Sequence, residues 1–155
     1  MEKKYIIVFS TSLIIVLIDQ IAKFLIKTNF QLNQSVPLIN NLFHLTYIQN
    51  TGAGFGILKN QALLLIFISL AVIGIILYNF DKIKNNETLL QILVGFVLGG
   101  TIGNLIDRLA YGHVIDFLDF QIWPIFNFAD SFVTIGVIGL INLYLAFSTG
   151  PSLKT

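Results

Sequence analysis

Residues 89–108 of this chain read LLQILVGFVLGGTIGNLIDR, and they decide its fold. The stretch is almost wholly apolar up to Asn104, and its length matches the roughly 20 residues that a helix needs to cross a bilayer. Gly95, Gly99 and Gly103 recur every four residues, which leaves a small-residue stripe that a second helix can approach closely. The stretch therefore predicts a membrane-spanning helix that packs against a neighbour and ends in the charged pair Asp107–Arg108.

Three further stretches, about residues 5–26, 62–80 and 131–147, are also apolar and long enough to span a membrane. Of the 155 residues, 55% are hydrophobic and 11% are charged, against about 25% charged in a soluble globular domain. We therefore predict a single membrane domain over residues 1–155. Its fold class is an all-α membrane protein of four transmembrane helices with a small extracytoplasmic β element.

The first apolar stretch also resembles a cleaved signal peptide, because Lys3 and Lys4 precede it. No small-x-small cleavage site follows, however, and the segment continues through Asp19 and Lys23 into more apolar residues. We interpret it as a retained helix.

Four spans place both termini on the same side of the membrane. The lysines near the termini and between the second and third spans favour a cytoplasmic location for both termini by the positive-inside rule. These are Lys3, Lys4, Lys82, Lys84 and Lys154. The opposing loops carry Lys27 and Lys59; we discount Lys23 and Arg108, which sit at helix ends beside aspartates.

The two loops on the other side contain short segments of strand character. Residues 43–48 (FHLTYI) partly alternate and are rich in β-formers, and residues 114–120 (VIDFLDF) have a similar composition. These segments predict a small β element on the outer surface of the membrane.

The four spans bring most of the unexplained polar residues to this same face. Ionisable groups at membrane depth are costly and usually mark a functional site. The residues are Asp19 and Lys23 on the first helix, Asn104, Asp107 and Arg108 on the third, Asp116 and Asp119 in the second outer loop, and Asn127 and Asp130 before the fourth.

Helical spacing suggests which of these residues pair. Asp19 and Lys23 are four apart and share a helix face, as an interfacial ion pair or as support for a site. Asn104, Asp107 and Arg108 also fall on one face, where an Asp–Arg pair would either anchor the helix or belong to a site.

The aspartates differ in their sequence surroundings. Asp116 is flanked by apolar residues, so desolvation should raise its pKa. Asp119 would face the other side of a strand, and we expect it to be a solvated loop residue. Asn127 and Asp130 are favoured N-cap types, and the positive end of the fourth helix would stabilise an Asp130 carboxylate, without deciding which aspartate is protonated.

Composition excludes several other kinds of site. There is no cysteine, so thiolate nucleophiles and cysteine-based metal sites are excluded, and neither His44 nor His113 lies in an HExxH pattern. The net charge of +1 argues against nucleic acid as a partner.

Two functional alternatives remain open at this point. A transporter or channel subunit would use Asp19, Lys23, Asp107 and Arg108 as an ion path, although the middles of the second and fourth spans lack charge. A metal-dependent hydrolase or transferase would bind a divalent cation with carboxylates drawn from Asp107, Asp116, Asp119 and Asp130.

Five short motifs, in this order and on this four-span plan, resemble the bacterial lipoprotein signal peptidase (signal peptidase II) family. They are Asp19-Gln20-x-x-Lys23, Asn50-x-Gly52-Ala53-x-Phe55, Gly99-Gly100-x-x-Gly103-Asn104-x-x-Asp107-Arg108, Val114-Ile115-Asp116-Phe117 and Phe126-Asn127-x-Ala129-Asp130. Gly54 departs from the alanine that is common in the family.

The resemblance implies an intramembrane aspartyl protease with Asp116 and Asp130 as its catalytic dyad and with no metal or cofactor. Asn50, Asn104, Arg108 and Asn127 would hold substrate or orient the dyad, and Asp19, Lys23, Gly52, Asp107 and Ala129 would support them. The partners would be membrane lipid and a prolipoprotein whose diacylglyceryl-modified cysteine follows the cleaved bond. The enzyme would lie in the bacterial cytoplasmic (inner) membrane and act at its outer face.

Overall fold

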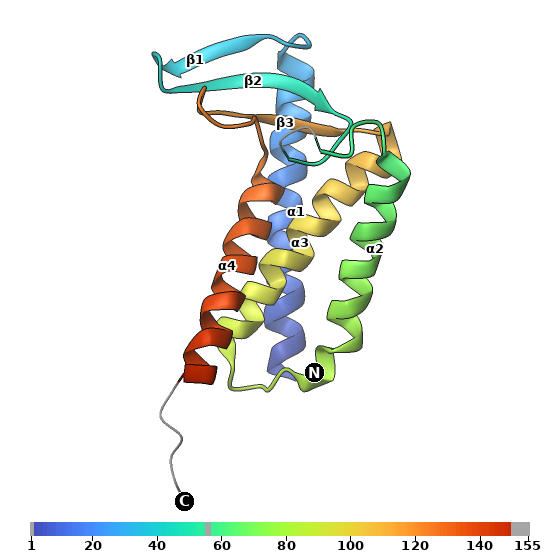
Figure 1. Ribbon diagram of the computed structural model, residues 1–155, viewed down its shortest axis with the longest axis vertical. Coiled ribbons are helices and arrows are strands. Elements are labelled where there is room, and N and C mark those ends of the chain that lie inside the picture. Colours follow the sequence, from blue (N-terminus) through green and yellow to red (C-terminus); the bar gives the residue numbers. More distant parts are fainter. Residues whose placement is uncertain (1, 55–56, 150–155) are drawn as a thin grey trace, which may run out of the picture.

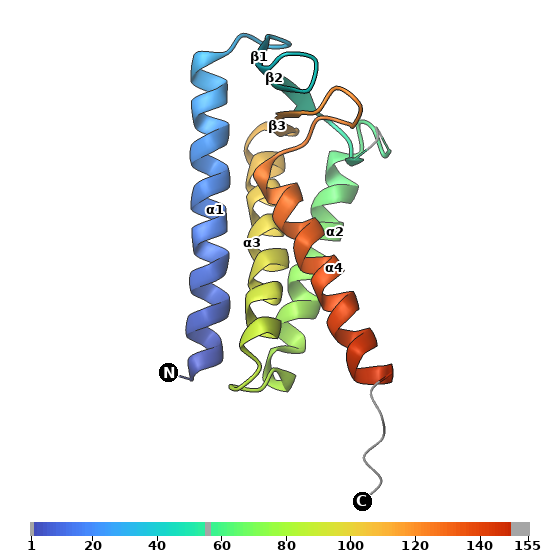
Figure 2. The ribbon, with the colours of Figure 1, turned by 90° about the vertical axis from the view of Figure 1, so that its left-hand side faces the viewer.

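A bundle of helices capped by a small sheet makes up the computed structural model, which describes residues 2–54 and 57–149. The elements are α1 (Lys3–Asn29), β1 (Ser35–Ile39), β2 (Phe43–Asn50), α2 (Ala62–Tyr78), the short 3-10 helix η2 (Phe80–Lys82), α3 (Thr88–Tyr111), β3 (Val114–Asp119) and α4 (Phe128–Thr149). α3 packs against α1, α2 and α4, and the sheet lies across one end of the bundle (Figures 1 and 2). Phe55 of the outer-loop motif and Lys154 lie outside the described residues.

Three helices of the described chain are long and apolar enough to cross a membrane: α1, α3 and the part of α4 from Phe128 to Ala146. α2 is apolar but shorter, with 17 residues. The second predicted stretch ends differently from expectation, because Phe80 belongs to η2 rather than to α2. α4 begins three residues before the predicted residue 131.

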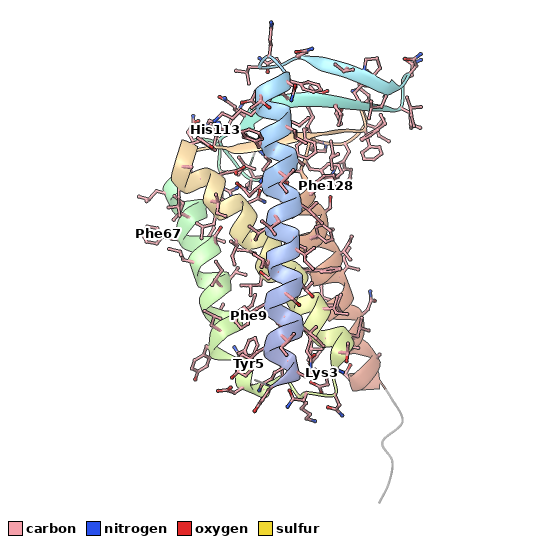
Figure 3. All side chains as sticks on the ribbon, turned by 180° about the vertical axis from the view of Figure 1, so that it is seen from behind. Lys3, Tyr5, Phe9, Phe67, His113 and Phe128 are labelled. Carbon is pink, nitrogen blue, oxygen red and sulfur yellow. The ribbon has the colours of Figure 1, made fainter. Side chains whose placement is uncertain are left out.

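The outward faces of the helices are covered with exposed apolar side chains. Leu13 of α1, Leu63 of α2 and Tyr144 of α4 are 59%, 67% and 72% exposed. Figure 3 shows side chains projecting outward along the whole bundle, with Phe67 among them. A soluble protein does not expose continuous apolar faces of this kind, so the chain is a multi-pass membrane protein.

The glycine stripe of α3 allows the predicted close approach of another helix, and that helix is α1. A Cβ atom at Gly99 would lie 2.7 Å from the carbonyl oxygen of Ser12, so only glycine permits this approach. The adjacent Gly100 faces the other way, against Ala129 of α4. α3 therefore packs closely against α1 on one side and against α4 on the other.

The sheet is antiparallel, in the order β1-β2-β3. β2 and β3 confirm the two predicted strands, whereas β1 was not predicted. Its five residues include Pro37 and are mostly exposed, as suits an edge strand that carries little apolar alternation. Beneath the sheet, Ile26 of α1 packs with Tyr47 and Phe117, which fixes the sheet to the end of α1.

Candidate active site

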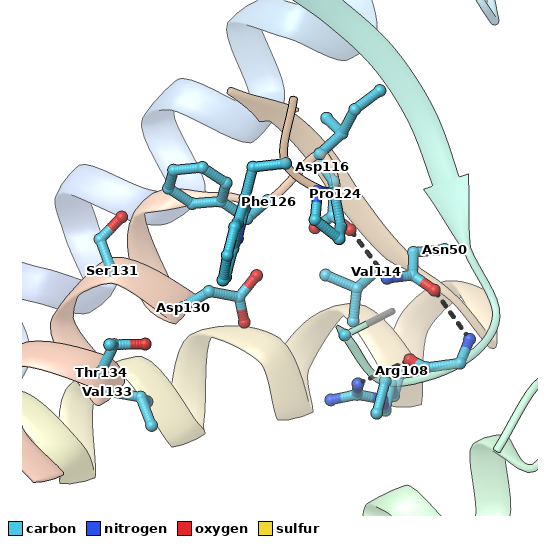
Figure 4. Close-up of a pocket in the computed structure, with 15 residues that line it drawn as sticks. Asn50, Arg108, Val114, Asp116, Pro124, Phe126, Asp130, Ser131, Val133 and Thr134 are labelled. Atoms are coloured by element: carbon cyan, nitrogen blue, oxygen red, sulfur yellow. Dashed lines mark hydrogen bonds between the residues drawn. The ribbon is translucent and has the colours of Figure 1, made fainter. Parts of the chain in front are cut away.

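Polar side chains from four elements meet where the sheet joins the bundle (Figure 4). Asn50 ends β2, Asp116 lies in β3, and Arg108 lies in the last turn of α3. Asp130 lies in the first turn of α4 and points into the space between these elements. The sequence-distant motifs thus converge at one site.

Asp116 is buried, with 1% of its surface exposed, and both of its carboxylate oxygens accept hydrogen bonds from amides. Asn50 Nδ2 donates to Oδ2 at 2.9 Å, and Asn127 Nδ2 donates to Oδ1 at 2.7 Å. Burial, and then the neighbouring Asp130 carboxylate, raise the pKa of Asp116 to about 7, although the two amide donors oppose the shift. The expected rise in the pKa of Asp116 is therefore confirmed.

Asp130 is held by the start of its own helix and by α3. The backbone N–H of Asn127 donates to Asp130 Oδ2 at 3.3 Å, and the backbone N–H of Asp130 donates to Asn127 Oδ1 at 2.9 Å. This reciprocal pair is a capping box, which confirms the predicted cap and explains the earlier start of α4. Asn104 Nδ2 donates to the other carboxylate oxygen of Asp130 at 2.7 Å.

Asn127 connects the two aspartates. Its side-chain oxygen accepts from the Asp130 backbone while its side-chain nitrogen donates to the Asp116 carboxylate. The same nitrogen lies 3.1 Å from Asn104 Oδ1, so neutral amides surround both carboxylates.

A second group of charges, formed by Asp19, Lys23 and Asp107, lies between α1 and α3. Lys23 Nζ is 2.7 Å from Asp19 Oδ2 and 3.0 Å from Asp107 Oδ2, and it donates to Asn104 Oδ1 at 3.0 Å. The three charged residues are at most 1% exposed. The predicted Asp19–Lys23 pair is confirmed, and Asn104 links it to Asp130.

The Asp19 and Asp107 carboxylates also fix the backbone beside the paired aspartates. Asp19 Oδ1 accepts the backbone N–H of Ala129 at 3.0 Å, and Asp107 Oδ2 accepts that of Ile115 at 3.1 Å. Ala129 and Ile115 are the residues directly before Asp130 and Asp116. Lys23, bridging both carboxylates, thereby ties together the two segments that carry the paired aspartates.

The prediction that Asp107 and Arg108 form an ion pair with each other is wrong. Consecutive residues of a helix point about 100° apart, so Asp107 turns toward Lys23 while Arg108 turns toward the pocket. Arg108 Nη2 donates to the carbonyl oxygen of Gly52 at 3.2 Å and so holds the outer loop. Gly52 is itself closely packed, because its Cβ would lie 2.7 Å from the carbonyl oxygen of Ile57.

The expectation of a solvated Asp119 is also wrong. Asp119 ends β3, is 7% exposed, and accepts a hydrogen bond of 2.7 Å from the Thr46 hydroxyl of β2. It accepts a second bond, of 2.9 Å, from the backbone N–H of Gln121. Strand pairing supplies the Thr46 donor, the bend after β3 supplies the Gln121 donor, and Asp119 does not line the pocket.

The pocket beside Asp116 and Asp130 has a volume of about 450 Å³. Its walls come from the outer loop, the end of α3, β3, the β3–α4 connection and α4 (Figure 4). They comprise Asn50, Gly52, Ala53, Gly54, Arg108, Val114, Asp116, Trp123, Pro124, Ile125, Phe126, Asp130, Ser131, Val133 and Thr134. Sequence reasoning missed the wall from Trp123 to Ile125 and the α4 residues after Asp130, because apolar and hydroxyl side chains carry no recognisable motif.

Gln20 was quoted in a motif but given no role. Its Nε2 donates to Asp107 Oδ1 at 3.0 Å and to the carbonyl oxygen of Gly103 at 3.1 Å.

Within residues 2–54 and 57–149, no three His, Asp or Glu side chains converge to hold a metal ion. Asp107 and Asp119, two members of the alternative metal site, are engaged elsewhere.

A sequence model of a known family, described as signal peptidase (SPase) II, matches residues 11–146. The chain belongs to the signal peptidase II family. It is 46% identical to a lipoprotein signal peptidase of Moorella thermoacetica over 127 residues, which cover 82% of this chain and 85% of the relative. It is 45% identical to a lipoprotein signal peptidase of Halothermothrix orenii over 138 residues, which cover 89% and 94%.

Solved structures of bacterial membrane enzymes share the fold of this signal peptidase II family member. One superposes with a TM-score of 0.90 at 33% identity and covers 100% of this chain and 98% of that chain. Another has a TM-score of 0.81 at 32% identity and covers 89% and 92%. Signal peptidase II is a family of proteases that process lipoproteins, which confirms the resemblance and favours a peptidase over a transporter or channel.

Proposed function

We propose that the chain is an aspartyl endopeptidase that removes the signal peptide of diacylglyceryl-modified prolipoproteins by cutting just before the lipidated cysteine. The observation that carries this proposal is the placement of Asp116 and Asp130 on one pocket, with Asn127 bonded to both. Two carboxylates in one site titrate as a pair and hold one proton between them.

In the proposed resting enzyme, Asp116 carries the shared proton and Asp130 is ionised. Burial raises the pKa of Asp116 to about 7, so this carboxyl group is mostly protonated below that pH. Asp130 lies at the positive end of α4 and receives the Asn104 amide, both of which stabilise a carboxylate.

The reaction then needs only water and these two groups. Asp130 takes a proton from water as the water oxygen bonds to the scissile carbonyl carbon, and Asp116 gives its proton to the carbonyl oxygen. Asp130 next gives the acquired proton to the amide nitrogen as the C–N bond breaks. Asp116 recovers its proton from the tetrahedral hydroxyl group as the C=O bond re-forms, which restores the starting state.

The membrane placement is part of the proposal. α2 has 17 residues and a length of about 26 Å, which suits a fourth span with flanking residues at the interface. Residues 1–155 would form one membrane domain with the sheet at the outer face of the cytoplasmic membrane. The lysines at the opposite end, such as Lys3, support cytoplasmic termini.

The substrate would enter from lipid and meet the dyad at the level of the sheet. α2 packs on α3 and makes little contact with α4, so we place the signal helix and the acyl chains on the pocket side of α4. Asn50 and Arg108 would contact the peptide, and the membrane lipid would solvate the apolar helix faces.

The experiment is cleavage of a purified diacylglyceryl-modified prolipoprotein by the parent enzyme in detergent, with and without EDTA. The same prolipoprotein without the lipid, and the Asp116→Asn enzyme, serve as controls. The proposal expects one new product whose N-terminus is the lipidated cysteine, formed only by the parent and only from the lipidated substrate. Equal cleavage of the unlipidated protein, or loss of activity with EDTA, would contradict it.

A further inference from the structure

The α4 wall of the pocket continues beyond the dyad, away from the sheet. Thr134 lies four residues after Asp130, so it shares the same helix face about 6 Å farther along the helix. Ser131, Val133 and Thr134 all line the pocket, next to Asp130 (Figure 4). The wall therefore carries a hydroxyl group one turn deeper than the reacting centre.

The Thr134 hydroxyl has no hydrogen-bond partner in the part of the chain that the structure describes, and its side chain is exposed. A hydroxyl within a helix can donate to a carbonyl one turn earlier. Thr28 does so to Phe24 at 2.8 Å, Ser69 to Leu65 at 2.9 Å, and Ser131 of the same wall to Asn127 at 3.0 Å. Thr134 thus offers a free hydrogen-bond donor to the pocket. A hydroxyl that faces only hydrocarbon is unfavourable, so a bound acceptor would stabilise it.

We propose that the Thr134 hydroxyl donates a hydrogen bond to an ester carbonyl of the diacylglyceryl group on the substrate cysteine. The inference rests on the proposed function and deepens it. The two esters are the first polar groups of the lipid beyond the cysteine, so they lie deeper than the scissile bond. Ester oxygens only accept hydrogen bonds, and a hydroxyl beside the apolar Val133 supplies the donor without placing a charge at that depth.

The test compares two synthetic lipopeptides that differ only in the lipid linkage, a diacyl ester and a dialkyl ether. The ether keeps the length and the apolar chains but lacks the carbonyl acceptors. The parent enzyme should cleave the ester with a kcat/KM about fivefold higher, since a neutral hydrogen bond contributes about 1 kcal/mol and 1.4 kcal/mol is tenfold. The difference should lie mainly in KM.

Thr134→Val keeps the shape of the side chain and removes the hydroxyl. It should cleave both lipopeptides at the rate that the parent shows with the ether. Thr134→Ser retains a hydroxyl and should restore the ester preference. Thr101→Val, the same change on α3 and away from the pocket walls, should leave the preference as it is in the parent.

Persistence of the full ester preference in Thr134→Val would overturn the inference, as would a parent enzyme that cleaves ester and ether equally well. Failure of the parent to cleave either lipopeptide is a different result. It would overturn the proposed function, and this inference with it.

Discussion

Two pairs of aspartates lie within this small site, all buried except the half-buried Asp130, and they are held in opposite ways. Asp116 and Asp130 receive hydrogen bonds from neutral amides and line the pocket. Asp19 and Asp107 flank the Lys23 ammonium and do not line that pocket. The first pair is suited to share and move a proton, whereas the second is suited to remain ionised and hold structure.

The difference shows how a buried lysine can stabilise the site without contacting either aspartate of the proposed dyad. A lysine directly beside Asp116 would keep both dyad carboxylates ionised, and neither could then donate a proton. Lys23 instead contacts Asn104, whose amide contacts Asp130. The charge therefore fixes the geometry of the site through a neutral intermediary.

The largest effect is expected at Lys23. Replacing it in Lys23→Met leaves Asp19 and Asp107 buried without a cation, which should lower the free energy of unfolding by about 3–5 kcal/mol. Thermal unfolding in detergent measures this. The control is Lys27→Met, because Lys27 is exposed and contacts the Tyr111 ring rather than a carboxylate. Equal melting temperatures for the two variants would contradict the structural role of the lysine-held pair.

The second expected effect is on the pH dependence of cleavage. In the proposed mechanism Asp116 is protonated at the start, and its pKa is raised to about 7, so kcat/KM should fall about tenfold per pH unit above that value. Asn50 donates to the ionised form and thereby lowers the pKa of Asp116. Asn50→Ala should therefore raise the pKa and move the alkaline limb of the kcat/KM profile to higher pH. A shift to lower pH would contradict the assignment of the acid to Asp116.

The smallest expected effect is at Asp119, which belongs to neither pair. Asp119→Asn weakens the bonds from Thr46 and Gln121 and should cost about 1–2 kcal/mol of stability. Cleavage per folded molecule should stay within about twofold of the parent, because a strand-end carboxylate outside the pocket has no part in proton transfer. A steady-state assay corrected for the folded fraction checks this. Loss of cleavage in the folded variant would place Asp119 in the reaction.

The sequence was sufficient for the parts of the fold that follow from local patterns. Apolar length located the helices, the four-residue glycine spacing of α3 anticipated close packing on a neighbouring helix, and Asn127 with Asp130 anticipated the cap of α4. Each of these depends on residues within one turn or one helix face of one another.

Contacts across elements were beyond reach from the sequence. Spacing placed Asp107 beside Arg108, yet its partner Lys23 comes from another helix, 84 residues earlier in the sequence. The burial of Asp119 depends on Thr46 in a neighbouring strand. The edge strand β1 has no alternation to reveal it, and the free hydroxyl of Thr134 is visible only once α4 is placed along the pocket.

The most direct test of the contrast between the two pairs is single-turnover cleavage by four variants, Asp116→Asn, Asp130→Asn, Asp19→Asn and Asp107→Asn, each normalised to its folded fraction. The account predicts losses of more than about 1,000-fold for the first two, which remain folded, because acid and base each contribute by proton transfer. The last two should be less stable yet retain cleavage within about tenfold per folded molecule. Normal turnover by Asp116→Asn or Asp130→Asn, or a folded Asp19→Asn as inactive as they are, would contradict it.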